Sequence, residues 1–80
     1  MVIDLRLCNL PINTGAVVES MGGNDSLTYR LMDLGITKGA IITPIFSSPF
    51  GDPTAYSVQD TVVALRKTDC ENILVIPIHE

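Results

Sequence analysis

The chain has 80 residues and a formal net charge of -4, from five basic and nine acidic side chains. This length provides one domain, over residues 1–80, close to the lower size at which a hydrophobic core alone stabilises a fold. So few basic residues argue against a nucleic acid partner, since phosphate binding depends on clustered cations. No apolar run reaches the roughly 20 residues that span a bilayer or resembles a signal peptide, so we expect a cytoplasmic protein without membrane insertion.

The apolar fraction of 46% comes mostly from Ile, Leu and Val, whereas aromatic residues make up 5% and Trp is absent. An aliphatic composition of this kind predicts a compact interior. It also argues against the groove lined with several aromatic side chains that binds polyproline peptides.

The first predicted strand is Ala16–Ser20, which follows a tight turn. Asn13 and Gly15 lie in that turn, and both residue types adopt the left-handed backbone conformation with little strain. The glycine pair 22–23 then interrupts the chain before a helix.

A helix is predicted over residues 26–34. Leu27, Leu31 and Leu34 follow the i, i+4, i+7 spacing of one helix face, so we expect that face to be buried against the sheet. Gly35 is positioned to end the helix in the left-handed conformation, and the isoleucine after it should pack back on Leu31 in a Schellman motif.

Pro44 lies inside the next apolar segment and cannot donate a hydrogen bond to a neighbouring strand, so we expect an edge or a bulge there. A homodimer formed by strand addition near this residue is one option, which the proline itself opposes. The loop 47–53 separates this strand from a hairpin that turns near Asp60. The strands predicted in this region are 40–46, 54–59 and 61–65.

Thr68 and Glu71 have capping-box spacing and predict one short helical turn before the last strand, 73–76. The resulting fold class is mainly β: a small SH3-like barrel of about five strands with one inserted helix and a short C-terminal helical turn. Closure into a barrel protects the edges that so small a sheet would otherwise expose.

The segment Leu27–Gly39, with the sequence LTYRLMDLGITKG, resembles the signature of the FeoA family, an Arg-Leu-Leu-Asp-Leu-Gly core followed by Thr-Pro-Gly. Pro49–Pro53 resembles the family's Pro-Leu-Gly-Asp-Pro loop. The segment 64–67, leading into 73–75, resembles its C-terminal pattern. The chain departs from the family at Met32, at Lys38 and at Ile12-Asn13, three places where the substitutions fit the predicted local structure.

This resemblance implies an SH3-like barrel and a role beside FeoB, the membrane GTPase that carries ferrous iron into bacteria. The chain would then be a cytoplasmic accessory protein that docks on a FeoB-type transporter and modulates it. The alternative is a metal-responsive regulatory or adaptor module, related to the C-terminal SH3-like domain of iron-dependent repressors.

The candidate partner-binding residues come from the helix signature and from the predicted loop. Phe50 is a large apolar residue at the tip of a Pro/Gly loop, where burial is difficult. A purely structural role remains open for the helix residues, because Arg30 and Asp33 are spaced for a weak local ion pair. The candidates are Arg30, Leu31, Met32, Asp33 and Phe50.

We find no set of residues for catalysis and predict neither an enzyme nor a cofactor. The single histidine, His79, lies near the C-terminus, and the carboxylates are scattered through turns. Cys8 and Cys70 belong to no C-x-x-C pair and are expected to be free thiols. Together with His79, Asp69 and Glu71 they are the conceivable metal ligands, but none has ligand spacing, so the metal site is left undefined.

Overall fold

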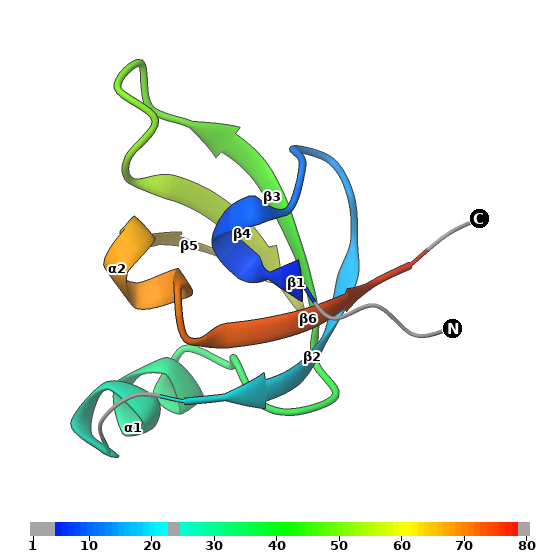
Figure 1. Ribbon diagram of the computed structural model, residues 1–80, viewed down its shortest axis with the longest axis vertical. Coiled ribbons are helices and arrows are strands. Elements are labelled where there is room, and N and C mark those ends of the chain that lie inside the picture. The colour runs from blue at the N-terminus through cyan, green and yellow to red at the C-terminus, as the bar shows by residue number, and fades with distance from the viewer. Residues whose placement is uncertain (1–4, 23–24, 79–80) are drawn as a thin grey trace.

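Six strands form one antiparallel sheet in the order β1-β6-β2-β3-β4-β5 within the residues that the computed structural model describes, 5–22 and 25–78. The sheet curls around its core, with α1 at one end of the molecule and the loop between β3 and β4 at the other (Figure 1). The elements in chain order are β1 (Leu5–Arg6), the 3-10 helix η1 (Leu7–Asn9), β2 (Ala16–Met21), α1 (Asp25–Asp33), β3 (Ile41–Ser47), β4 (Thr54–Val58), β5 (Thr61–Leu65), α2 (Lys67–Cys70) and β6 (Ile73–Pro77).

The described residues contain one more strand than the sequence predicts. β1 consists of two residues, paired as Leu5 with Val75 and Arg6 with Leu74 on β6. A two-residue strand is too short to show an alternating pattern, so periodicity could not reveal it. The adjoining η1 buries Leu7 completely.

The expected bulge occurs in β3. The register between β3 and β4 shifts between Pro44 and Phe46, so Ile45 is the extra residue. β2 pairs with β3 only at Ile41 and Ile42, so Pro44 lies in the part of β3 that has already left β2. Its carbonyl accepts a hydrogen bond from the backbone N–H of Asn13 at 2.6 Å. The edge at Pro44 is therefore already partly occupied by the turn before β2.

A left-handed backbone was predicted at two residues of the turn before β2, Asn13 and Gly15, and one of these two predictions is confirmed. Asn13 has a φ of 69°, in the left-handed region. Gly15 does not adopt a positive φ, and this part of the prediction is wrong. A Cβ at Gly15 would lie 3.4 Å from Oγ1 of Thr43, a distance of ordinary van der Waals contact, so space does not require glycine here either.

The predicted Schellman motif ends α1. The N–H of Ile36 donates to the carbonyl of Leu31 and the N–H of Gly35 to that of Met32, both at 3.0 Å, and Gly35 has a φ of 93°. Leu31 and Ile36 are buried, but Leu34 is 38% exposed. The expected burial of Leu34 is wrong because α1 stops at Asp33, and the helical periodicity stops with it.

The last helix is capped two residues earlier than the sequence pattern predicts. α2 begins at Lys67, and the carboxylate of Asp69 accepts a hydrogen bond from the backbone N–H of Arg66 at 3.2 Å. The N–H of Lys67 donates to Oδ1 of Asp52 at 2.7 Å. The predicted cap by Thr68 and Glu71 is therefore wrong, because tertiary hydrogen bonds from the β3–β4 loop help to set the start of the helix.

Buried side chains of η1, β2, α1, β3, β4, β5, α2 and β6 meet in one mostly aliphatic core, and Leu5 of β1 packs against it. No buried residue of the described chain is charged. Tyr56 and Cys70 are its least apolar members. The core residues are Leu7, Leu10, Ala16, Val18, Leu31, Ile36, Ile42, Tyr56, Val58, Val63, Leu65, Cys70, Ile73 and Val75.

Replacing Leu31 by Ala should lower the free energy of unfolding by about 2–5 kcal/mol, because the substitution removes buried methyl groups and leaves a cavity. Met32→Ala is the matched control on the adjacent position, and its change should stay below about 1 kcal/mol because Met32 is 45% exposed. Urea unfolding followed by circular dichroism measures both values. Equal losses in the two variants would contradict the orientation of α1.

Candidate functional site

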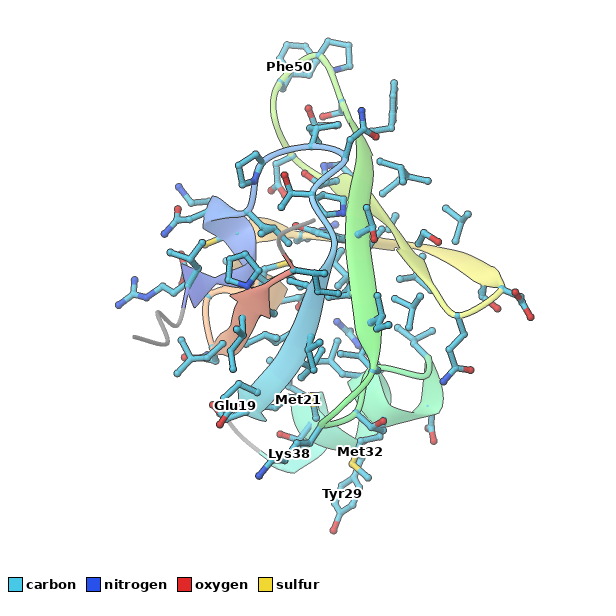
Figure 2. The ribbon with its side chains drawn as sticks, turned by 90° about the vertical axis from the view of Figure 1, so that its right-hand side faces the viewer. Glu19, Met21, Tyr29, Met32, Lys38 and Phe50 are labelled. Atoms are coloured by element: carbon cyan, nitrogen blue, oxygen red, sulfur yellow. The ribbon has the colours of Figure 1, made fainter. Side chains whose placement is uncertain are left out.

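The five sequence-predicted contact residues do not form one surface. The side chain of Leu31 is 1% exposed, so it cannot contact a partner directly, and this part of the prediction is wrong. Phe50 and Met32 lie at opposite ends of the longest axis (Figure 2). The molecule measures 34 Å along that axis. A contact that includes α1 is therefore distinct from one that includes the β3–β4 loop.

Exposed apolar side chains gather at the α1 end of the molecule. Tyr29 is 67% and Met32 45% exposed, and their i, i+3 spacing places them side by side on the helix. Met21, at the end of β2, is half-buried and packs against the core at the same end of the molecule, and Lys38 from the turn before β3 borders it (Figure 2). We call Met21, Tyr29 and Met32 the α1 surface.

The composition of the α1 surface suits protein recognition. Methionine is flexible and adapts to different partners, and tyrosine combines a large apolar ring with a hydrogen-bonding hydroxyl. Neither Tyr29 nor Met21 was among the contact residues predicted from the sequence. A signal for Tyr29 was present, because it precedes Met32 by one helical turn and lies away from the predicted buried face of Leu27 and Leu31. Met21 carried no such signal, since only the fold brings the end of β2 to this helix.

Arg30 does not pair with Asp33, as the local ion pair would require. Its Nη2 lies 3.0 Å from Oδ1 of Asp69 on α2, 39 residues further along the chain. The Arg30 side chain is 61% exposed and that of Asp69 17% exposed. Asp33 is exposed at the end of α1. Arg30 therefore links the two helices, while Asp33 remains available on the surface.

Asp69→Ala should lower the free energy of unfolding by about 1–2 kcal/mol, because Asp69 both caps the Arg66 N–H and pairs with Arg30. Arg30→Ala should cost less than about 1 kcal/mol, because only an exposed ion pair is lost. A double-mutant cycle by urea unfolding separates the two contributions. If Arg30→Ala proved more costly than Asp69→Ala, the capping role of Asp69 would be wrong.

The loop between β3 and β4 holds Phe50 in solvent. Phe50 is 95% exposed, although the loop around it is ordered by several hydrogen bonds. The N–H of Gly51 donates to the carbonyl of Ser48 at 2.8 Å, and the Ser48 hydroxyl donates to the carbonyl of Asp52 at 2.7 Å. A rigid loop that presents a phenyl ring is a suitable anchor for a partner.

The two cysteines lie on neighbouring elements. The thiol of Cys70 on α2 donates to the hydroxyl of Tyr56 at 3.5 Å in the core. Cys8 on η1 is half-buried and, with Asp52 and Tyr56, lines a pocket of about 190 Å³ beside this pair. Burial raises the pKa of Cys70 to about 11, and burial followed by the hydrogen bond to Cys70 raises the pKa of Tyr56.

These side chains do not assemble a metal site in the part of the chain that the structure describes. Residues 5–22 and 25–78 contain no group of three or more His, Cys, Asp or Glu side chains that could hold an ion. Cys70 is buried and its thiol bonds to the hydroxyl of Tyr56, and Asp69 is engaged by Arg30. His79 lies outside the described residues.

Burial of Cys70 predicts a loss of stability at alkaline pH. The pKa of this thiol rises from 9.0 to about 11 on folding, so between these values the unfolded chain releases a proton that the native chain keeps. The free energy of unfolding should therefore fall as the pH rises from 9 to 11, by up to about 1.4 kcal/mol per pH unit for this group. Tyr56 shifts in the same direction. Urea titrations across this range should show a shallower slope for Cys70→Val, and an unchanged slope would contradict the assignment.

Among the described residues, no helix is long and apolar enough to cross a membrane. The geometry defines a class of protein: a small barrel that presents apolar side chains at two separate ends.

Comparison with known proteins supplies the family. The FeoA domain matches residues 5–77, so the chain belongs to the FeoA domain family. It is 31% identical, over 69 residues, to a Fe(2+) transport protein A/Fe(2+) transporter FeoB fusion protein of Porphyromonas gingivalis. This alignment covers 86% of the chain but only 8% of the fusion protein.

Solved structures agree with this assignment. A FeoA-like protein from Clostridium acetobutylicum is 28% identical, with a TM-score of 0.89, and the match covers 100% of this chain and 93% of that one. FeoA of Stenotrophomonas maltophilia complexed with zinc, described as a prokaryotic SH3 domain protein, is 34% identical, with a TM-score of 0.74 and coverage of 94% and 88%. The predicted FeoA family and SH3-like fold are thus confirmed.

Proposed function

We propose that this chain is a cytoplasmic, non-catalytic accessory protein of ferrous iron transport that docks on a FeoB-type membrane GTPase and modulates its activity. The observation that carries the proposal is the relative in which a FeoA part and a FeoB part form one polypeptide. Covalent linkage raises the effective concentration of one part at the other, which is useful when the two parts must meet.

The distribution of exposed side chains supports a docking role. The α1 surface carries Tyr29 and Met32, and the Phe50 loop carries a nearly fully exposed ring. Exposed side chains of these types are enriched at protein interfaces and often anchor them. Arg30, Met32 and Asp33 belong to α1, so a partner that covers the α1 surface would lie beside all three.

We favour the α1 surface over Phe50 as the main contact. It combines three side chains from two elements, Met21, Tyr29 and Met32, and it lies within or next to the segment that resembles the FeoA signature. Phe50 stands at the far end of the molecule and would require a second, separate contact.

Co-purification with the full-length FeoB-type transporter of the same organism tests the proposal. Wild type should bind, and Met32→Gln combined with Tyr29→Ser should weaken binding at least about 10-fold, because an apolar contact becomes polar without a change in the core. Phe50→Ser is the matched control at the opposite end and should retain most of the affinity.

Circular dichroism and thermal unfolding must show that each variant is folded. If wild type does not bind the transporter in any nucleotide state, and deletion of this protein leaves ferrous iron uptake unchanged, the proposed function is wrong. If Phe50→Ser alone abolishes binding, docking occurs at the loop instead of the α1 surface.

A further inference from the structure

The sheet has one long edge without a neighbouring strand. In residues 5–22 and 25–78, β5 pairs with β4 only, and it is the last strand of the sheet order. The opposite edge strand, β1, has two residues, whereas β5 has five. An edge strand with unpaired backbone groups is a template for another strand.

The register of the hairpin identifies the unpaired groups. Val58 and Thr61 close the hairpin as a direct pair around a two-residue turn, which requires this pair to exchange hydrogen bonds. The alternation of antiparallel pairs then makes Val63 and Leu65 bond to β4 as well. Val62 and Ala64 consequently direct their backbone N–H and C=O groups away from β4, toward the open edge.

A groove runs beside this edge. It has a volume of about 540 Å³ and lies between the end of β5 on one side and Arg30 of α1 and Leu34, just after α1, on the other. The β5 side includes Ala64, which is exposed, and Arg66 just after the strand, and Thr68 and Asp69 of α2 also line the groove. One wall thus presents backbone hydrogen-bonding groups and the other an apolar side chain, the two features that a bound extended peptide uses.

The charges at the groove favour an acidic occupant at one end. Arg66 is exposed and has no ion pair among the described residues, while Arg30 is only partly neutralised by Asp69 because its side chain is 61% exposed. Asp69 also lines the groove, but its carboxylate is paired with Arg30, so Arg66 is the uncompensated cation of the groove among the described residues. The local charge at this end of the groove is thus positive, opposite in sign to the net charge of -4 of the whole chain. A carboxylate of the occupant would complement it.

The position of α1 argues for a single strand as the occupant. A Cβ at Gly35, just after α1, would lie 3.7 Å from Cγ1 of Val58, so the helix end packs against the tip of the β4–β5 hairpin. Arg30 links the helix to α2 beyond the other end of β5. These contacts place α1 along the open side of β5, where it would obstruct a second copy that continued the sheet with its own β5 and β4.

We propose that the groove between β5 and α1 binds an extended segment of the partner protein as an added strand, with an acidic residue of that segment next to Arg66. This inference rests on the proposed function, because the segment belongs to the FeoB-type transporter. The added strand pairs with Val62 and Ala64, and Leu34 covers its apolar side chains. Docking then combines main-chain pairing at β5 with the apolar contact at the α1 surface.

Ala64→Pro tests the main-chain pairing in the co-purification assay. The substitution removes an outward N–H that the isolated fold does not use, so the chain should fold but bind the full-length transporter at least about 10-fold more weakly. Ala64→Val is the matched control; it keeps the N–H and the strand preference and should bind nearly as wild type does.

Arg66→Glu provides a second test, which is informative even if β5 does not fold with proline at residue 64. Reversal of this charge should lower the affinity at least about 10-fold, while Arg66→Lys should retain most of it. Hydrogen exchange supplies an independent readout. The amides of Val62 and Ala64 should exchange rapidly in the free protein and become protected in the complex, whereas those of Val63 and Leu65 should be protected in both.

The outcomes separate this inference from the proposed function. If wild type binds and both Ala64→Pro and Arg66→Glu bind equally well, strand addition is wrong and the accessory role stands. Unchanged exchange at Val62 and Ala64 in the complex would overturn it as well. If wild type does not bind at all, the proposed function fails and this inference fails with it. Protection of Val62 and Ala64 in the free protein that grows with its concentration would identify a second copy as the occupant.

Discussion

The pairing of the last strand with the first two holds this fold together. β6 lies between β1 and β2, and its Val75 pairs with Leu5 on one side and with Val18 on the other. Val75 and Val18 are both buried, so the strand contributes backbone pairing and core packing at once. Since these partners are far apart in sequence, the sheet is complete only when nearly the whole chain is in place. Local elements such as α1 then gain their stability from the closed core.

Three sides of the short helix α1 make three different kinds of contact or surface. Leu31 enters the core, Tyr29 and Met32 form the exposed α1 surface, and Arg30 reaches α2 through Asp69. The Schellman motif at Gly35 fixes where the helix ends and thereby sets the rotation of all three sides. A change at this end of the helix would therefore affect core packing and the candidate contact surface together.

The core and the surface of this protein differ in the kinds of side chain that they contain. The described interior contains no charged residue, and its two most polar groups, Tyr56 and Cys70, satisfy each other. Exposed apolar side chains, an open strand edge and unpaired cations lie outside it. These surface features are the ones on which the proposed docking role rests. The proposed strand addition and apolar docking use two adjacent faces of α1.

The sequence by itself determined those parts of the local structure, such as turns and the end of α1, that depend only on neighbouring residues; the start of α2, set by a hydrogen bond to Asp52, was not among them. The left-handed Asn13, the Schellman motif at Gly35 and the bulge beside Pro44 could all be predicted. Only the tertiary structure decided which side chains meet. It exposed Leu34, paired Arg30 with Asp69 instead of Asp33 and separated Phe50 from α1. These outcomes depend on contacts between elements distant in sequence, and helix periodicity or residue spacing carries no information about such contacts.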